Sequence, residues 1–275
     1  MDQFISRMPQ SCGHHGVAMC RDILYVIYGE SRFSIGESRF SIGQIHVCSF
    51  DPKKNKWNPH DVGKGVWKNF SVTTYNEELY VIGGDSGFYQ QVKVYNPALG
   101  TWKGRAPMNV GRAGHCAVVL QKNIYVMAGH DGKVCHKSVE RYNPATNQWQ
   151  KVPSLSNARR SAAGAVSNGK IIVVGGFSAM EPSKAVEASC EVFDPCTNEW
   201  SLVTSPVIPR AACGTVSIDD IIYLFGGQHE EHFMNTVESF DLKHNEWRDV
   251  ATMPIDYQGS FHQASLVRLP KDFVS

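Results

Sequence analysis

Histidine is the residue type of this chain most able to bind a metal ion, and it occurs in three groups. These are His14 with His15, His130 with His136, and His229 with His232. Protein zinc sites use three or four ligands at characteristic spacings, commonly with cysteine or carboxylate. No such set is formed by these groups, so loop or surface histidine is the favoured interpretation. No metal ion and no cofactor is predicted.

Two further patterns could carry covalent chemistry. Cys190 and Cys196 flank a predicted turn and could form a disulfide. Free thiols are favoured, because the eight cysteines include no CxxC pair and most lie in apolar runs. The sequence has no Gly-x-Ser-x-Gly, phosphate-binding glycine loop or His-Glu-x-x-His. No catalytic residue is predicted, and the chain is not expected to be an enzyme.

Arginine recurs at a position where it could recognise carboxylates or carbonyl groups. Arg112 and Arg210 each lie thirteen residues before a tyrosine, and Trp67 and Cys12 hold the same place in two other segments. Arg160 is matched to them by allowing a slip of one residue. A guanidinium is planar and always charged, and it donates two hydrogen bonds at once. The alternative is that these arginines only bridge neighbouring repeats.

A repeated framework must position these residues. In five segments an aromatic residue precedes a tryptophan by seven residues, and 27 residues separate each of the first four tryptophans from the second glycine of the next pair. The segments are Phe50 to Trp57, Tyr95 to Trp102, Tyr142 to Trp149, Phe193 to Trp200 and Phe240 to Trp247. Only the interval from that glycine to the next aromatic varies, from 11 to 21 residues. One class of loop therefore carries the variation in length.

Within each repeat the local signals are those of strands and turns. Apolar runs such as 116–120 and 124–127 are short and rich in β-branched residues, and polar turn residues separate them. Four such strands cannot bury both faces of a sheet alone, whereas radial stacking of sheets can. The sequence predicts one all-β domain over 1–275, a β-propeller of four-stranded antiparallel blades. Five blades are complete, in units of about 11–60, 66–105, 111–152, 159–203 and 209–250.

The two ends of the chain fit this pattern only in part. Segments 2–9 and 260–269 are predicted to be terminal strands, the first an outer strand and the second an inner one. They belong either to an incomplete sixth blade or to a five-bladed ring with both ends placed against it.

The glycine pairs, the Tyr-Asn-Pro or Phe-Asp-Pro elements and the spaced tryptophans resemble the kelch repeats over essentially the whole chain. The recurring arginine and the Met-Pro pairs, Met8-Pro9 and Met253-Pro254, are most similar to the BTB-kelch group. The resemblance implies a protein-interaction domain, the substrate receptor of a cullin-based ubiquitin ligase. The cullin would be bound only through BTB and BACK segments, which this sequence lacks. The alternatives are a kelch scaffold without a ligase role and, more remotely, a propeller enzyme.

The resemblance also implies where a substrate protein binds. In similar kelch domains an arginine at the recurring position points toward the central pocket. Arg112, Arg160 and Arg210 match this arginine, whereas Trp67 and Cys12 replace it in the other two repeats. The variable loops should emerge on the same face, and exposed aromatics and arginines on a rigid scaffold are typical of binding hot spots. The loop candidates are Arg32, Phe33, Arg39, Phe40, Phe88, Tyr89, His130, His136, Phe177, His229, His232, Phe233 and Tyr257. Alternatively, some of these aromatics only pack their own loops.

The first four loop candidates come from a seven-residue segment, 30–36, that recurs without change as 37–43. The loop is predicted to tolerate this second copy, because doubling a loop's length costs only about 0.6 kcal/mol in closure entropy.

Composition limits the remaining partners. Lys and Arg total 27 and Asp and Glu total 26, so the net charge is +1 and no basic field favours nucleic acid or an anionic membrane. No apolar run is long enough to span a bilayer. A cytoplasmic protein is expected.

Overall fold

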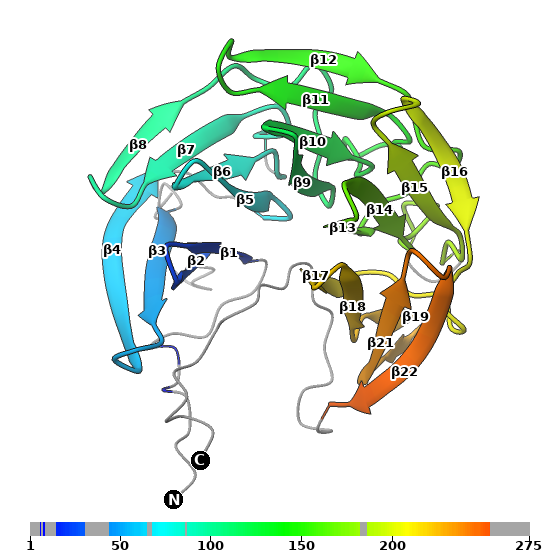
Figure 1. Cartoon of the computed structure of the whole chain (residues 1–275). Coiled ribbons are helices and arrows are strands. Elements are labelled where there is room, and N and C mark those ends of the chain that lie inside the picture. The colour runs from blue at the N-terminus through cyan, green and yellow to red at the C-terminus, as the bar shows by residue number, and fades with distance from the viewer. Residues whose placement is uncertain are drawn as a thin grey trace, which may run out of the picture.

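The computed structural model describes residues 6, 8, 15–30, 44–64, 68–85, 87–181 and 186–253. These residues form five antiparallel sheets of four strands and contain no helix. Figure 1 shows the sheets arranged around a central axis as the blades of a propeller. The predicted fold class and the five complete blades are confirmed. The predicted terminal strands 2–9 and 260–269 lie outside the described residues, except for Ser6 and Met8.

Consecutive strands pair in every blade, with the first strand nearest the axis and the fourth at the outer circumference of the propeller (Figure 1). The first blade has β1 (Gly16–Cys20), β2 (Ile23–Glu30), β3 (Gln44–Asp51) and β4 (Lys56–Lys64), and the second has β5 (Ser71–Tyr75), β6 (Glu78–Ile82), β7 (Val92–Asn96) and β8 (Thr101–Gly104). The third has β9 (Cys116–Leu120), β10 (Asn123–Met127), β11 (Val139–Asn143) and β12 (Gln148–Val152), and the fourth has β13 (Ala163–Ser167), β14 (Lys170–Val174), β15 (Cys190–Asp194) and β16 (Glu199–Val203). The fifth has β17 (Gly214–Ile218), β18 (Ile221–Phe225), β21 (Thr236–Asp241) and β22 (Glu246–Thr252), with a small hairpin, β19 (Gln228–His229) and β20 (His232–Phe233), between its middle strands.

The seven-residue spacing has a direct structural cause. The third and fourth strands of each blade pair so that the aromatic residue and the tryptophan lie directly opposite one another, as Tyr142 and Trp149 do. Their ring centroids are 4.9 Å apart, and the other four pairs lie at 4.8 to 5.3 Å. Cross-strand aromatic pairs of this kind stabilise a sheet. The spacing is therefore the length of the hairpin that brings the two rings together.

The same tryptophans connect neighbouring blades. The indole N–H of Trp149 donates to the carbonyl of Ala106 at 2.9 Å, and that of Trp247 donates to the carbonyl of Thr204 at 2.9 Å. Each acceptor lies four residues beyond the tryptophan of the preceding blade. In the first blade, Trp57 donates to the carbonyl of Ser6 at 2.8 Å. Ser6 thus makes the contact that the end of a preceding blade makes elsewhere in the molecule.

The glycine pairs let adjacent blades approach closely. Gly175 has a φ of 61°, and a Cβ atom built on it would lie 1.9 Å from the carbonyl oxygen of Arg210, at the start of the next blade. At Gly83 the corresponding distance to the carbonyl of Arg112 is 2.4 Å. Only glycine combines a positive φ with no side chain at such a contact. The backbone N–H groups of Gly84 and Gly176 donate to the same two carbonyls, at 2.8 and 3.0 Å.

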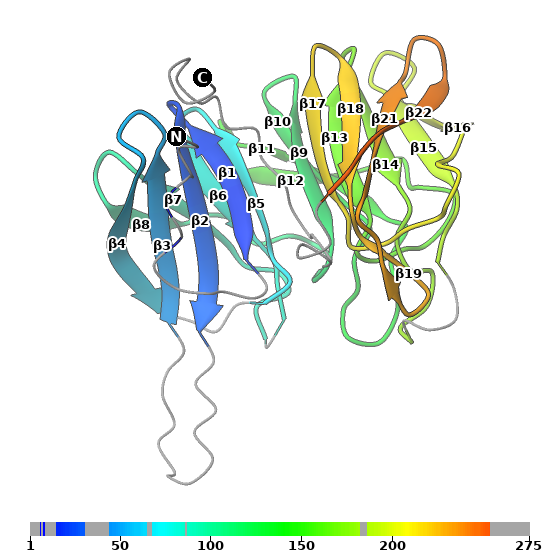
Figure 2. The same ribbon diagram turned by 90° about the horizontal axis from the view of Figure 1, so that it is seen from below.

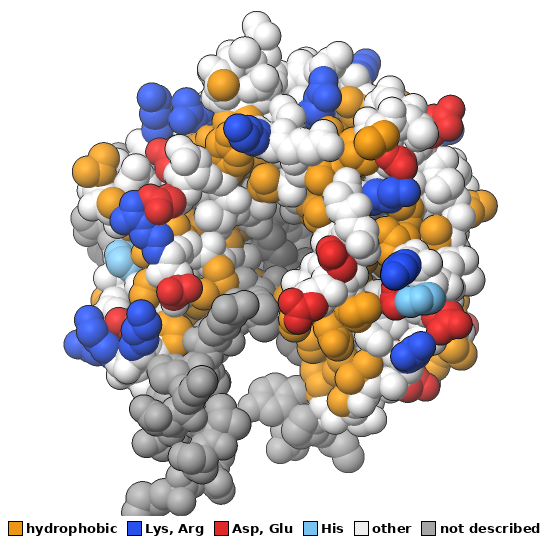
Figure 3. Space-filling model, in the orientation of Figure 1, with side chains coloured by type: hydrophobic (Ala, Val, Ile, Leu, Met, Phe, Trp, Pro, Cys, Tyr) orange, Lys and Arg blue, Asp and Glu red, His pale blue; other side chains and the backbone are white. Residues whose placement is uncertain are grey.

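The last blade is covered unevenly. In β14 the final four residues are all buried, whereas in β18 the residues alternate, with Ile221, Tyr223 and Phe225 half-buried. Because successive side chains of a strand point to opposite faces, one face of this blade is only partly covered by described residues. Hydrophobic side chains gather over this blade in Figure 3. No described strand lies between it and the first blade.

Candidate functional site

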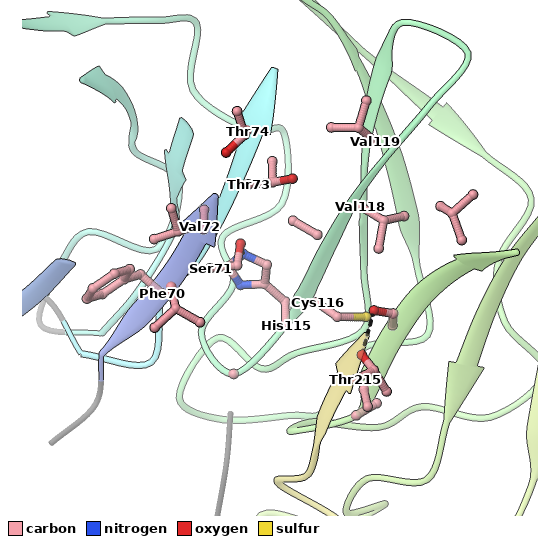
Figure 4. A pocket seen from close by; sticks show the side chains of 18 of the residues that line it. Phe70, Ser71, Val72, Thr73, Thr74, His115, Cys116, Val118, Val119 and Thr215 are labelled. Carbon is pink, nitrogen blue, oxygen red and sulfur yellow. Dashed lines mark hydrogen bonds between the residues drawn. The ribbon is translucent and has the colours of Figure 1, made fainter. Parts of the chain in front are cut away.

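The first strands of the blades surround a central cavity of about 400 Å³ (Figure 4). Its lining comes from β1, β5, β9, β13 and β17, and it is made of small apolar and hydroxyl side chains such as Thr74, Val118 and Thr215. Small-molecule sites have volumes of roughly 300–1,000 Å³ and hold a few convergent polar groups. The cavity is within this range, but few polar groups face one another in it.

A chain of backbone hydrogen bonds borders this cavity. Gly114 donates to the carbonyl of Asn69 at 2.7 Å, Ser161 donates to Gly114 at 2.6 Å, and Ala212 donates to Ser161 at 2.8 Å. All four residues have φ between 52° and 57°. Left-handed backbone at non-glycine residues costs about 1–2 kcal/mol each, so the surrounding structure must impose it. We call these four residues the mouth of the propeller.

A buried histidine lies directly beneath the mouth. His115 is 7% exposed, and its Nε2 lies 2.8 Å from the hydroxyl oxygen of Ser71 on the neighbouring blade. Burial, together with the nearby positive charge of Arg112, lowers the pKa of His115 to about 3. The imidazole is therefore neutral at physiological pH and joins the second blade to the third.

This histidine should make the stability of the fold sensitive to acid. The unfolded chain binds a proton at His115 below about pH 6.5, whereas the folded chain does so only near pH 3, so stability falls as the pH drops between these values. Between about pH 7 and pH 4.5 we expect a loss of about 2–3 kcal/mol from this group. Urea unfolding of the wild type and of His115→Gln, which cannot titrate, measures it. An equally steep loss in the variant would assign the acid sensitivity to other groups.

The variable loops and the linkers between blades share one rim, as predicted. The backbone N–H of Arg112 donates to the carbonyl of Tyr89 at 2.7 Å, and the backbone N–H of Leu155 donates to that of Lys137 at 2.9 Å. Each of these two linkers is therefore bonded to the loop of the preceding blade. Figure 2 shows the loop that carries β19 projecting from this rim, opposite the turn that joins β17 and β18.

Loops of successive blades also contact one another. The rings of Tyr89 and His130 meet edge to face at 6.5 Å, which joins the loops of the second and third blades. Cys135 Sγ lies 3.9 Å from Met180 Sδ, which joins the loops of the third and fourth blades. The described parts of loops 83–91, 128–138, 175–189 and 226–235 are together called the loop surface.

Arg112 and Arg210 do not point toward the central pocket, and that prediction is wrong. Both side chains are 0% exposed. Each turns into its own blade and pairs with a glutamate of the third strand, Arg112 with Glu140 at 3.3 Å and Arg210 with Glu238. Burial lowers the pKa of Arg112, whereas the charge of Glu140 raises it. The arginines are part of the framework that holds the linkers.

The slip used to match Arg160 is also wrong. The third equivalent is Arg159, which is 0% exposed and donates to Glu191 at 2.7 Å. Thirteen residues beyond Arg159 is Ile172, which occupies the place of the tyrosine, so no slip was needed. Arg160 is half-buried, with its guanidinium 4.8 Å from the centroid of Phe177. It donates to the carbonyls of Ala179 and Met180 and thereby holds the fourth blade's loop.

The sequence interpretation missed the glutamates that accept these arginines. A signal was present, because each glutamate lies two residues before the aromatic residue that pairs with the tryptophan of its repeat. These glutamates are Glu140, Glu191 and Glu238. In the first two repeats, where Cys12 and Trp67 replace arginine, the glutamate is replaced as well, by Cys48 and Lys93. Arginine and glutamate thus occur together or not at all.

The loop candidates differ in exposure. Phe177 is 3% exposed and Phe88 packs against the core, so these two aromatics support their own loops. Tyr89, His130 and His136 are half-buried, and Nδ1 of His229 lies 2.7 Å from the carbonyl of Pro209. His232 and Phe233 are exposed, the latter by 50%. The candidates Trp67, Arg32, Phe33, Arg39, Phe40 and Tyr257 lie outside the described residues.

Metal-binding and redox groups are sparse in the part of the chain that the structure describes. No cluster of three or more His, Cys, Asp or Glu side chains able to hold a metal ion is found there. The seven described cysteines, including Cys190 and Cys196, are free thiols. Within the same residues no helix is long and apolar enough to cross a membrane.

Comparison with known proteins agrees with this geometry. A family model described as the KLHDC2/KLHL20/DRC7 Kelch-repeats domain matches residues 14–207, and a Kelch motif matches residues 209–254. Mouse Kelch-like protein 35 is 30% identical over 207 residues, which cover 75% of this chain and 34% of that protein. Human Kelch-like protein 23 is 27% identical over 215 residues, covering 76% of this chain and 37% of that protein. The chain thus spans about a third of the length of these curated relatives.

Similarity to a solved structure extends to the shape of the molecule. The structure of YjhT superposes with a TM-score of 0.72 over 89% of this chain and 85% of that chain, at 16% sequence identity. At this identity the likeness concerns the fold alone.

Proposed function

Because the chain belongs to the kelch-repeat family of β-propellers, we propose that it is a protein-binding module whose loop surface receives the partner. The observation that carries this proposal is the contact between loops of successive blades. These loops are variable in length yet bonded to rigid linkers, which is the arrangement in which binding residues are commonly held on a scaffold. Partly exposed aromatic side chains, such as Tyr89 and Phe233, supply contact area at low entropic cost.

We further propose that the bound protein is a substrate delivered to a cullin-based ubiquitin ligase in the cytoplasm. The similarity to Kelch-like proteins and the predicted likeness to the BTB-kelch group support this role. Because the matched region is about a third of those relatives, cullin binding would belong to segments outside the propeller. A kelch scaffold without a ligase role is the second candidate. Co-purification of a cullin with the full-length gene product, and not with the propeller alone, would favour the ligase role.

Removing two partly exposed aromatics should weaken binding without unfolding the chain. Partners captured by the propeller from a lysate would first be identified by mass spectrometry. For the strongest partner, we expect Tyr89→Ala with Phe233→Ala to reduce the affinity about tenfold or more, because aromatic hot spots carry much of the binding energy. Leu99→Ala is the matched control, since Leu99 is 72% exposed in the turn between β7 and β8 on the opposite rim. Equal affinities of the double variant and the wild type would contradict the proposed surface.

A further inference from the structure

A second hollow, of about 430 Å³, lies beside the last blade and shares no lining residue with the central cavity. Its apolar wall consists of Val207, Ile208 and Val250, which are 84%, 41% and 51% exposed. Its acidic part consists of Glu238 on β21 and Asp249 on β22. Exposed aliphatic side chains are thus grouped around carboxylates in this hollow. We call it the blade-five groove.

In the third and fourth blades, the glutamate that corresponds to Glu238 accepts hydrogen bonds from the backbone. Glu140 accepts the backbone N–H groups of Asn109 at 2.9 Å and Val110 at 3.0 Å. Glu191 accepts the backbone N–H of Ser156 at 2.7 Å. In each case the donor belongs to the linker. Asn109 and Ser156 each lie three residues before the buried arginine of their blade. The linker thereby closes over the carboxylate.

In the last blade this closure is not made. The linker residue three before Arg210 is Val207, and its N–H does not bond Glu238. Glu238 is 2% exposed, one oxygen accepts from Arg210, and the other, Oε2, has no hydrogen-bond partner. A buried carboxylate oxygen without a partner has lost its hydration without compensation and destabilises the fold. Glu238 is one of the residues that line the blade-five groove, so a donor that enters the groove beside this side chain could satisfy its free oxygen.

The charges of the groove specify the ligand. Arg210 supplies one positive charge, and Glu238 and Asp249 supply two negative charges, so one carboxylate charge is left over. Asp249 is exposed and acts on Arg210 from the outer strand. A ligand with a cationic head and an aliphatic stem matches both the excess charge and the apolar wall.

We propose that the blade-five groove binds a lysine or arginine side chain of a partner polypeptide. The stem lies against Val207, Ile208 and Val250, and the charged head donates to Oε2 of Glu238 and to Asp249. The site is separate from the loop surface, so it adds a contact for a basic segment of a protein partner. The proposed groove site does not depend on the loop surface, and a negative result with the loop-surface variants would not affect it.

The probes are N-acetyl-arginine methylamide and the neutral N-acetyl-norleucine methylamide, titrated into full-chain protein labelled at Ile and Val methyl groups. We expect saturable NMR shifts at Val207, Ile208 and Val250 with the arginine probe only. Glu238→Gln should abolish them, and Asp249→Asn should weaken binding about threefold, as for an exposed ion pair. Glu191→Gln is the matched control, because it removes the equivalent charge from a carboxylate that is already satisfied. It should leave the affinity unchanged.

Three results would overturn the proposal. They are equal shifts with the neutral probe, no saturable shift in the wild type, or equal loss of binding in Glu191→Gln and Glu238→Gln. If Glu238→Gln does not fold, unchanged affinity in Asp249→Asn is the contradicting result. Binding that emerges only after Arg268→Ala with Lys271→Ala would instead assign the groove to the chain's own C-terminal segment.

Discussion

Replacing Arg159 by alanine lowers the free energy of unfolding by about 3–5 kcal/mol, the largest loss expected from a single side chain of the framework. The substitution leaves Glu191 charged at 0% side-chain exposure with its arginine removed. It also leaves the carbonyls of Gly175 and Ser189 without the donors that Arg159 supplies at 3.1 and 2.9 Å. Urea denaturation followed by tryptophan fluorescence measures the effect.

The adjacent arginine provides the control. Arg160 is half-buried and makes two hydrogen bonds to carbonyls together with a ring contact, but it has no buried carboxylate partner. Arg160→Ala should therefore cost only about 1 kcal/mol. A loss at Arg160 as large as that at Arg159 would show that the slipped alignment, and not the buried pair, describes the framework.

Replacing Gly175 by alanine should destabilise the propeller by about 3 kcal/mol or more. The added Cβ would meet the Arg210 carbonyl at 1.9 Å, and neither backbone can withdraw without breaking the Gly176 to Arg210 hydrogen bond. The positive φ of 61° adds its own cost. Thermal unfolding measured by circular dichroism would report this as a lowered Tm.

Gly100 separates the two causes. Its φ is 65°, close to that of Gly175, but no atom lies within 4 Å of a Cβ built on it. Gly100→Ala should cost only about 1 kcal/mol, the price of left-handed backbone alone. If both variants lost the same stability, the close approach of adjacent blades would not be the reason for the glycine pair.

Much of the fold could be predicted because the repeat spacings reflect local geometry. The seven residues between Tyr142 and Trp149 are the length of one hairpin, and a hairpin depends on neighbouring residues only. Burial of the recurring arginine could not be read from Arg112 or Arg210 alone. An arginine suits a pocket and a buried ion pair equally well, and the choice depends on a glutamate that lies 28 residues further along the chain, in another strand.

The candidate site was predicted less completely for a related reason. The rim that carries the loops follows from strand order, so residues such as Tyr89 and His130 were placed on the correct side of the molecule. Whether an aromatic on that rim is exposed depends on what its own loop leaves uncovered. Phe177 is buried beneath Arg160 and Phe233 is not, although each lies in a loop that begins with a glycine pair.

At the mouth of the propeller, the backbone geometry is independent of the side chains. The hydrogen bonds that join Asn69, Gly114, Ser161 and Ala212 are made by the main chain, so none of their side chains is needed to hold the four linkers together. Ala212 is buried, but Gly114 and Ser161 are half-buried, so another residue that tolerates a positive φ, such as asparagine, aspartate or glycine, could replace either of these two without changing the geometry. Single substitutions could therefore give this propeller a different ligand preference on an unaltered scaffold, which makes the mouth the natural place to begin the engineering or the divergence of its specificity.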